Sequence, residues 1–299
     1  MTREARPALQ WQSKLILLLV VPWTGIHGLL QSFFWFRQVP VVAWTTLGIS
    51  GIFGLIVWRL RAGTLGAAAT GAMITASLMY STTQFPYATS WLHGGLMPLL
   101  AVFLLTFVAT KIGHKKKERL GTGESRRGRN SAQVAANLGM AALVSIEASW
   151  SAVGLHPFSG LVQFVALSAL AEAAADTVSS EIGQVFGGIP KMITTFKRVE
   201  PGIDGGITLA GTVAGIVAAA VVSTIGVSVL GGNPLEIVAF AAAATSAATF
   251  GLLFDSLLGA TFERAAWLNN DAVNFLSTLS TAIIATILGI PLMAHFLVA

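Results

Sequence analysis

Long apolar runs separated by short polar stretches make up almost the whole chain. Each run is about 17 to 26 residues long, close to the roughly 20 residues that an α-helix needs to cross a bilayer. Transmembrane β-strands would instead appear as segments of about ten residues with alternating hydrophobicity. The pattern therefore predicts an all-α, polytopic transmembrane bundle of about nine helices. The expected helices cover residues 15–34, 41–58, 64–80, 92–110, 132–153, 160–183, 206–230, 236–258 and 272–297.

The composition supports a membrane location. Hydrophobic residues make up 54% of the chain and charged residues only 10%, whereas soluble domains carry about 25% charged residues. The chain contains no cysteine, which excludes disulfide bonds and thiolate metal sites. An integral membrane protein of the helical class is therefore expected.

The positive charges indicate how the helices are oriented. If the N-terminus is cytoplasmic, all but one of the 18 Lys and Arg residues fall on the cytoplasmic side, and only Arg37 lies outside. This distribution supports nine helices and a C-terminus outside. The net charge of +5 then reflects orientation and contact with membrane lipids, so no nucleic-acid binding is expected. A compact chain without an evident transit peptide favours the inner (cytoplasmic) membrane of a prokaryote.

Four carboxylates lie at least partly inside the predicted helices: Glu147, Glu172, Asp176 and Asp255. An ionisable side chain near the bilayer centre costs about 2.5 to 3.5 kcal/mol, which makes it a candidate for function. The central parts of the helices contain no Lys or Arg, so an intramembrane salt bridge is not expected. These acids must be protonated, bound to a metal, or close enough to the cytoplasmic edge to meet water.

Glu172 and Asp176 are spaced i, i+4, which places both on one face of their helix. Asp255 lies near the same cytoplasmic boundary, with Glu181 as an outer candidate. Carboxylates are the ligands that Mg²⁺ or Mn²⁺ prefers, usually together with substrate phosphates. A structural or merely protonated pair is the open alternative.

A basic, glycine-rich loop over residues 187–206 follows the acidic helix. Its basic side chains suit phosphate oxygens, and the glycine pair at its end frees backbone amides at the start of a helix. The alternative is an ordinary positively charged cytoplasmic loop with turn glycines. No Walker A pattern is present. The candidate phosphate-binding residues here are Lys191, Thr194, Thr195, Lys197, Arg198, Glu200, Gly202, Asp204, Gly205 and Gly206.

Weaker candidates for positioning a nucleotide or acceptor begin two other helices. Arg129, Asn130 and Gln133 lie at the start of one of them, with Asn137 one turn further in, where an anion could bind at the helix N-terminus. A purely structural role for these residues is an equal alternative. Asp271 and Asn274 begin the last helix, although helix capping alone would explain Asp271 equally well. The run Lys115–Lys117 is expected to be a solvated loop. The GxxxG pattern at residues 211–215 is expected to serve close helix packing.

Five motifs together resemble one family. They are Gly-Arg-Asn-Ser-Ala-Gln-Val (128–134), Ala-Glu-Ala-Ala-Ala-Asp-Thr-Val-Ser-Ser-Glu-Ile-Gly (171–183), Lys-Arg-Val-Glu-Pro-Gly-Ile-Asp-Gly-Gly (197–206), Asp-Ser-Leu-Leu-Gly-Ala (255–260) and Asn-Asp-Ala-Val-Asn-Phe (270–275). In this order they resemble the integral membrane family of plant phytyl-phosphate kinase and transmembrane protein 19. The chain is also distantly similar to CTP-dependent dolichol and phytol kinases.

The resemblance implies a membrane-embedded isoprenyl-phosphate kinase. Such an enzyme transfers a phosphoryl group from a nucleoside triphosphate, with CTP expected, to a prenyl monophosphate such as phytyl or geranylgeranyl phosphate. Glu172, Asp176, Lys197 and Arg198 are then the catalytic candidates, and Glu172, Asp176, Glu181 and Asp255 the candidates for binding Mg²⁺. The chain is interpreted as one membrane domain over 1–299, with a variable N-terminal helix region (1–50), a basic cytoplasmic loop (111–131) and a catalytic core (168–275).

A cation- or proton-coupled transporter, or a lipid flippase, would use the same intramembrane carboxylates. Basic residues and glycines on the same side favour phosphate chemistry, and the lack of an evident inverted repeat weighs against transport. A lipid-binding scaffold without turnover is a third class, and homodimer formation is left open.

Overall fold

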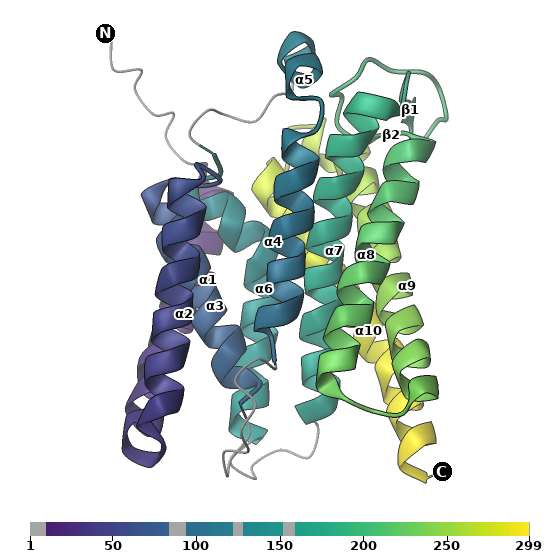
Figure 1. Ribbon diagram of the computed structural model, residues 1–299. Helices are drawn as coiled ribbons and strands as arrows, with labels where there is room; N and C mark the ends of the chain where they lie inside the picture. Colours follow the sequence, from purple (N-terminus) through teal and green to yellow (C-terminus); the bar gives the residue numbers. More distant parts are fainter. Residues whose placement is uncertain (1–9, 84–93, 122–127, 152–158, 299) are drawn as a thin grey trace, which may run out of the picture.

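Nine long α-helices form a bundle in the computed structural model, which describes residues 10–83, 94–121, 128–151 and 159–298 (Figure 1). They are α1 (Trp11–Gln38), α2 (Pro40–Arg59), α3 (Leu65–Ser81), α4 (Leu96–Lys111), α6 (Ser131–Ser151), α7 (Ser159–Phe186), α8 (Leu209–Leu230), α9 (Pro234–Leu258) and α10 (Asn270–Val298). Each overlaps one predicted helix. The prediction of an all-α polytopic bundle is therefore confirmed.

The remaining elements are short. Helix α5 (His114–Leu120) follows α4, and the π-helical turn η1 (Gly259–Glu263) continues α9. Strands β1 (Lys191–Met192) and β2 (Gly206–Ile207) form a small antiparallel pair between α7 and α8. Part of the predicted basic loop, residues 122–127, lies outside the described residues.

Helix length and hydropathy agree with a membrane location. Among the described residues, six helices are long and apolar enough to cross a bilayer: α1, α2, α7, α8, α9 with η1, and α10. The pair α4–α5, bent by 66°, would add a seventh span. Helices α3, α4 and α6 are shorter or more polar, and they lie alongside the others in the bundle (Figure 1).

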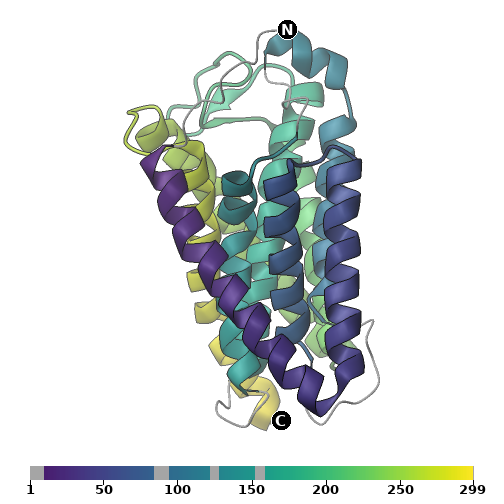
Figure 2. The ribbon, with the colours of Figure 1, turned by 90° about the vertical axis from the view of Figure 1, so that its left-hand side faces the viewer.

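Helix α1 begins at one end of the bundle, and helix α10 ends at the opposite end. Figure 1 shows α5 and the β1–β2 pair at one end and the end of α10 at the other. Helix α1 starts at the end that carries α5 and runs diagonally across the bundle (Figure 2). We call this end, which holds α5, β1–β2 and η1, the basic end, because it carries most of the Lys and Arg residues. Arg37 lies in the last turn of α1, at the opposite end.

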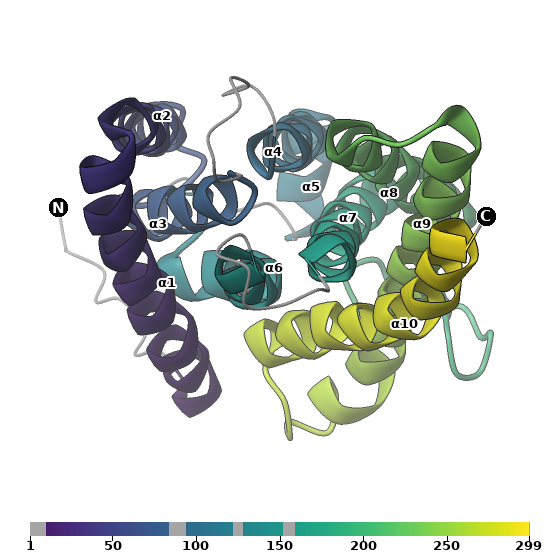
Figure 3. The same cartoon turned by 90° about the horizontal axis from the view of Figure 1, so that it is seen from below.

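Helix α7 is the central element of the bundle. Seen along the helix axes, it is surrounded by α4, α6, α8, α9 and α10 (Figure 3). In the most apolar 18-residue stretch of α7, 78% of the residues are buried, whereas the buried share in the other candidate spans is 28–39%. A β-carbon at Gly211 or Gly215 of α8 would lie 2.6 or 2.7 Å from a carbonyl oxygen of α7, so only glycine fits this crossing. The predicted packing role of the GxxxG pattern is confirmed.

Candidate functional site

A polar cavity of about 520 Å³ lies at the basic end, between α6, α7, α9, η1, the start of α10 and the β1–β2 segment. Its charged and amide side chains come from these helices, from the segment just before α6, from η1, and from the loop that joins β1 to β2. Such a concave site with several convergent polar groups is the usual form of a ligand site. These side chains belong to Arg129, Gln133, Asn137, Asp176, Glu181, Gln184, Asp204, Asp255, Glu263, Asn270 and Asn274.

Three carboxylates predicted from the sequence meet beside this cavity. Asp176 of α7 and Asp255 of α9 line it, and Glu172 lies one helical turn deeper on α7 with 1% of its surface exposed. Asp255 is close enough to interact electrostatically with both of the others. No described residue donates a hydrogen bond to Oε1 of Glu172 or to Oδ1 of Asp255, although both atoms are buried.

Gly251 of α9 makes room for Glu172. A β-carbon at this position would lie 1.9 Å from Oγ1 of Thr281 and 2.6 Å from Cγ of Glu172. The missing side chain therefore allows α9 to approach α10 while the glutamate extends between them. Ser277 of α10 lies beside the carboxyl groups of both Glu172 and Asp255.

These carboxylates fit a Mg²⁺ ion that is shared with a phosphate ligand. Among the described residues, no group of three or more His, Asp or Glu side chains is arranged to hold a metal by itself. Mg²⁺, however, is usually bound by one or two carboxylates together with substrate phosphates and water. The unpartnered oxygens of Glu172 and Asp255, with Asp176 facing the cavity, supply such a partial ligand set. Metal binding by these residues stays a prediction.

The backbone before α6 holds Arg129 at the cavity. Its N–H donates to the carbonyl of Ala62 (3.0 Å), and its carbonyl accepts from the N–H of Thr64 (2.9 Å). Gly128 precedes it at φ 70°, where a β-carbon would lie 2.5 Å from the Ala62 backbone. The guanidinium donates to Oγ1 of Thr177 at 3.1 Å, and its charge interacts with Asp176.

Asn130 has a structural role in the start of α6. Its Oδ1 accepts hydrogen bonds from the backbone N–H groups of Ala132 and Gln133, at 2.8 and 3.0 Å. Oε1 of Gln133 in turn accepts from the N–H of Asn130 at 2.8 Å. This reciprocal cap stabilises the helix N-terminus. Asn130 does not line the cavity, and its role in positioning a ligand stays a prediction.

The loop between α7 and α8 brings one acidic residue and three glycines to the cavity. Gly202, Asp204, Gly205 and Gly206 all line it. Gly205 adopts φ 77°, and a β-carbon there would lie 2.4 Å from Cβ of Ala260 in η1. Glycine at this position therefore lets the loop pack directly against the end of α9.

The basic residues of the same loop point elsewhere. Lys191 and Arg198 face each other across an isolated β-bridge, and both are exposed, as is Lys197. Thr194, Thr195 and Glu200 are exposed as well. None of these six residues lines the cavity. The phosphate-binding role predicted for them is therefore not supported by proximity in this structure, and it stays a prediction.

Asp204 lies at the open edge of the cavity. Partial burial raises the pKa of Asp204 above its ordinary value of 3.8, and the nearby Arg264 guanidinium opposes this rise. Well below pH 3.8 the carboxyl is neutral in both the folded and the unfolded protein, so its partial burial costs no stability. As pH increases through the raised pKa, the partly buried carboxyl of Asp204 ionises and the folded state becomes less stable.

In melting curves from pH 3.5 upwards, the Asp204→Asn protein should therefore gain thermal stability relative to wild type. A difference between the two proteins that does not vary with pH would contradict this.

Glu181 forms a buried ion pair with Lys117 of α5. Nζ of Lys117 lies 2.5 Å from Oε2 of Glu181, and Oγ1 of Thr110 donates to Oε1 at 3.1 Å. The Lys117 side chain is 1% exposed, so the expectation that the whole Lys115–Lys117 run is solvated is wrong for this residue. Both oxygens of Glu181 are engaged, and a metal role for it stays a prediction.

Asp271 is not the cap of α10. Oδ1 of Asn269 accepts from the N–H of Ala272 at 2.9 Å and caps the helix instead, so the capping interpretation of Asp271 is wrong. Asp271 accepts a hydrogen bond from Oγ of Ser13 at 2.6 Å, and Gln12 donates to the carbonyl of Trp267 at 2.7 Å. These contacts join the start of α1 to the α9–α10 connection. Asp271 does not line the cavity, whereas Asn274 does.

Gln133 and Asn137, which sequence analysis included in the possible anion site at the start of this helix, α6, both line the cavity. Their i, i+4 spacing on α6 places both on one helix face. Sequence analysis gave no role to three other lining residues with charged or amide side chains: Gln184, Glu263 and Asn270. Glu263 belongs to the π-helical turn that continues α9, and π-helical turns often occur at functional sites. Asn270 begins α10. No local pattern indicated a role for Gln184 or Glu263, and Asn270 appeared only within the motif at 270–275.

Comparison with known proteins places the chain in a family. The chain is 32% identical over 226 residues to Protein VTE6, chloroplastic, of Arabidopsis thaliana, covering 75% of this chain and 65% of that protein. It is 33% identical over 197 residues to the membrane protein MJ0933 of Methanocaldococcus jannaschii, covering 64% of this chain and 75% of the relative. Protein PGR of Arabidopsis thaliana is 27% identical over 246 residues, covering 68% of this chain and 84% of the relative.

The chain thus spans less than two thirds of the length of VTE6. No solved structure matches the chain. Residues 48–282, which include every carboxylate and amide that lines the cavity, match the family described as Integral membrane protein DUF92. The family resemblance seen in the motifs is confirmed, and the chain belongs to the DUF92 family of integral membrane proteins.

Proposed function

We propose that this protein is a membrane-embedded isoprenyl-phosphate kinase. It would transfer a phosphoryl group from a nucleoside triphosphate to a prenyl monophosphate such as phytyl or geranylgeranyl phosphate. One observation carries the proposal: the carboxylates of Glu172, Asp176 and Asp255 and the guanidinium of Arg129 converge at one cavity at the basic end. Family membership and the resemblance to plant phytyl-phosphate kinase support the prenyl substrate.

The reaction joins an oxygen of the acceptor phosphate to the γ-phosphorus of the nucleotide. The bond from that phosphorus to the β,γ-bridging oxygen breaks, and a nucleoside diphosphate leaves. Because the acceptor phosphate is already ionised at neutral pH, no strong general base is required. Positioning and charge neutralisation then account for most of the catalysis, as in other phosphoryl transfers.

Different residues of the chain would bind the metal, the acceptor and the nucleotide. Glu172, Asp176 and Asp255 would hold Mg²⁺, which neutralises phosphate charge when it is bound. Arg129 would orient the acceptor, and the backbone amide of Gly205 would face the nucleotide phosphates, whereas the Gly206 N–H already donates to the carbonyl of Ile203 at 3.0 Å. Lys191, Lys197 and Arg198 would contribute to nucleotide attraction from the exposed side of the loop.

The proposed location is the inner membrane of a prokaryote, with the basic end facing the cytoplasm. The excess of Lys and Arg at this end supports the orientation. The relative in Methanocaldococcus jannaschii is compatible with such a membrane, whereas the name of VTE6 places that plant protein in the chloroplast.

The assay uses purified protein in lipid nanodiscs with Mg²⁺, geranylgeranyl or phytyl monophosphate, and CTP, ATP, GTP or UTP. We expect prenyl diphosphate and nucleoside diphosphate in equal amounts, with CTP as the preferred donor, and no product when EDTA removes the metal. Intact substrates with all four nucleotides, together with cation or proton flux in liposomes, would instead establish the transporter class.

A further inference from the structure

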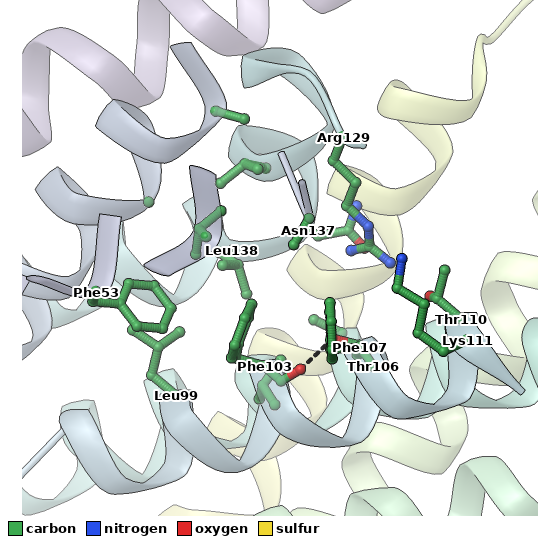
Figure 4. Close-up of a pocket in the computed structure, with 17 residues that line it drawn as sticks. Phe53, Leu99, Phe103, Thr106, Phe107, Thr110, Lys111, Arg129, Asn137 and Leu138 are labelled. Atoms are coloured by element: carbon green, nitrogen blue, oxygen red, sulfur yellow. Dashed lines mark hydrogen bonds between the residues drawn. The ribbon is translucent and has the colours of Figure 1, made fainter. Parts of the chain in front are cut away.

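A second, apolar cavity lies beside the polar one. We call it the apolar slot. It is formed by α2, α3, α4, α6 and α7 and has a volume of about 90 Å³. Phe53, Leu99, Phe103 and Leu138 lie along it in Figure 4. Among the residues that the structure describes, no Asp or Glu lines the slot.

The slot and the polar cavity share two residues. Arg129 and Asn137 line both, so the two spaces meet at the start of α6. Lys111, at the end of α4, also lines the slot. Figure 4 shows the side chains of Arg129 and Lys111 together at one end of the slot and Phe53 at the other. Two cations therefore mark the end that opens towards the acidic site.

An aromatic row leads from the apolar end to these cations. The rings of Phe53 and Phe103 are 5.3 Å apart, and those of Phe103 and Phe107 are 5.7 Å apart. Nζ of Lys111 lies 5.3 Å from the centre of the Phe107 ring. The slot is thus apolar along its length and positively charged at one end. A lipid with a hydrocarbon chain and one anionic phosphate has the complementary shape and charge.

We infer that the slot binds the acceptor lipid: the first isoprene units lie along the aromatic row, and the phosphate lies between Arg129 and Lys111. This inference rests on the proposed function and assigns the acceptor half of the site. It places the acceptor phosphate on the α4–α6 side of Asp176, opposite the Asp204–Gly206 turn. The slot is smaller than the roughly 300–1,000 Å³ of pockets that enclose a whole ligand, so only the part of the chain nearest the phosphate fits.

Binding of tritiated geranylgeranyl monophosphate to the protein in nanodiscs, without nucleotide, tests the slot directly. Gly71 of α3 lines the slot, and its added β-carbon would have no neighbour nearer than 3.9 Å, so a leucine side chain can extend into the space. Gly71→Leu should weaken binding about tenfold or more by filling the slot. Gly51→Leu on α2, where a β-carbon has nothing within 4 Å, is the matched control and should bind as wild type does.

The charge is tested in the same assay. Arg129→Gln should weaken binding of the monophosphate by about 10- to 100-fold, and Arg129→Lys should restore part of it. Arg119→Gln, at an exposed position of α5, removes the same charge and should have no effect. Inorganic phosphate and geranylgeraniol, each of which lacks one half of the ligand, should compete poorly.

The outcomes separate the slot from the kinase activity. Weak binding by Gly71→Leu and Arg129→Gln, with normal binding by both controls, supports the slot even if no nucleotide yields diphosphate. Wild-type affinity in both variants overturns the inference, even if the wild-type protein makes diphosphate. Melting temperatures within a few degrees of wild type verify that each variant is folded.

Discussion

Replacing Asp176 with Asn is expected to lower the rate of prenyl diphosphate formation by on the order of 10²–10³-fold. Asp176 lines the polar cavity and lies within electrostatic range of Arg129 and Asp255. The substitution keeps the shape of the side chain and removes the charge that would hold Mg²⁺ against the transferred phosphate. Single-turnover measurements at saturating nucleotide and lipid give the rate of the chemical step.

The matched control for this loss is Glu147→Gln. Glu147 is also a carboxylate within a helix, but it is exposed on α6 and lies outside the cavity. Its substitution should leave the rate unchanged. Binding of prenyl monophosphate without nucleotide should survive in Asp176→Asn, because the inferred lipid contacts lie at Arg129 and Lys111. A turnover rate equal to that of wild type would remove Asp176 from the proposed site.

Hydropathy alone predicted the helices, because each helix surrounded by lipid must be apolar over most of its length. The predicted limits fall short where polar residues extend a helix beyond the apolar run. Helix α1 begins at Trp11 rather than at residue 15, and the additional turn contains the buried Gln12 and Ser13. Their partners, Trp267 and Asp271, lie more than 250 residues away along the chain. A pattern among neighbouring residues in the sequence cannot predict such long-range contacts.

The acidic half of the site was predictable, whereas of the predicted basic residues only Arg129 lines the cavity. The i, i+4 spacing of Glu172 and Asp176 fixes their common face, and the topology places Asp255 at the same end. The loop cations depend on the pairing of β1 with β2, in which Lys191 is exposed and Met192 is buried. An alternation over two residues is too short to be read from sequence. Charge composition therefore identified the correct end of the bundle, but it did not show that the loop cations point away from the cavity.

Lys117 is a second residue whose position could not be predicted from the sequence. Its neighbours Lys115 and Lys116 are exposed, and all three look alike in the sequence. The short helix α5 follows Gly113, which adopts φ 65° and packs where a β-carbon would lie 2.5 Å from the Val185 side chain. This turn directs one lysine of the run towards α7. The bend of 66° between α4 and α5, rather than any charge pattern, decides which lysine is buried.

Lys117→Met is expected to destabilise the protein by roughly 3–5 kcal/mol, because it leaves the Glu181 carboxylate without its cation in a largely buried position. Nζ of Lys117 also donates to the carbonyls of Ala109 and Thr110, which would lose a donor. Chemical denaturation in detergent micelles, followed by circular dichroism, measures the change. Lys115→Met, two residues away on the same helix in an exposed position, should stay within about 0.5 kcal/mol of wild type.

The double variant Lys117→Met with Glu181→Leu distinguishes a charge effect from a packing effect. Replacing both partners of a buried ion pair by apolar residues is often neutral, so the double variant should be more stable than Lys117→Met alone. The two substitutions should therefore be strongly non-additive. Additive losses would mean that the two charges act independently, and the position of α5 against α7 would then depend on the packing of Gly113 against Val185.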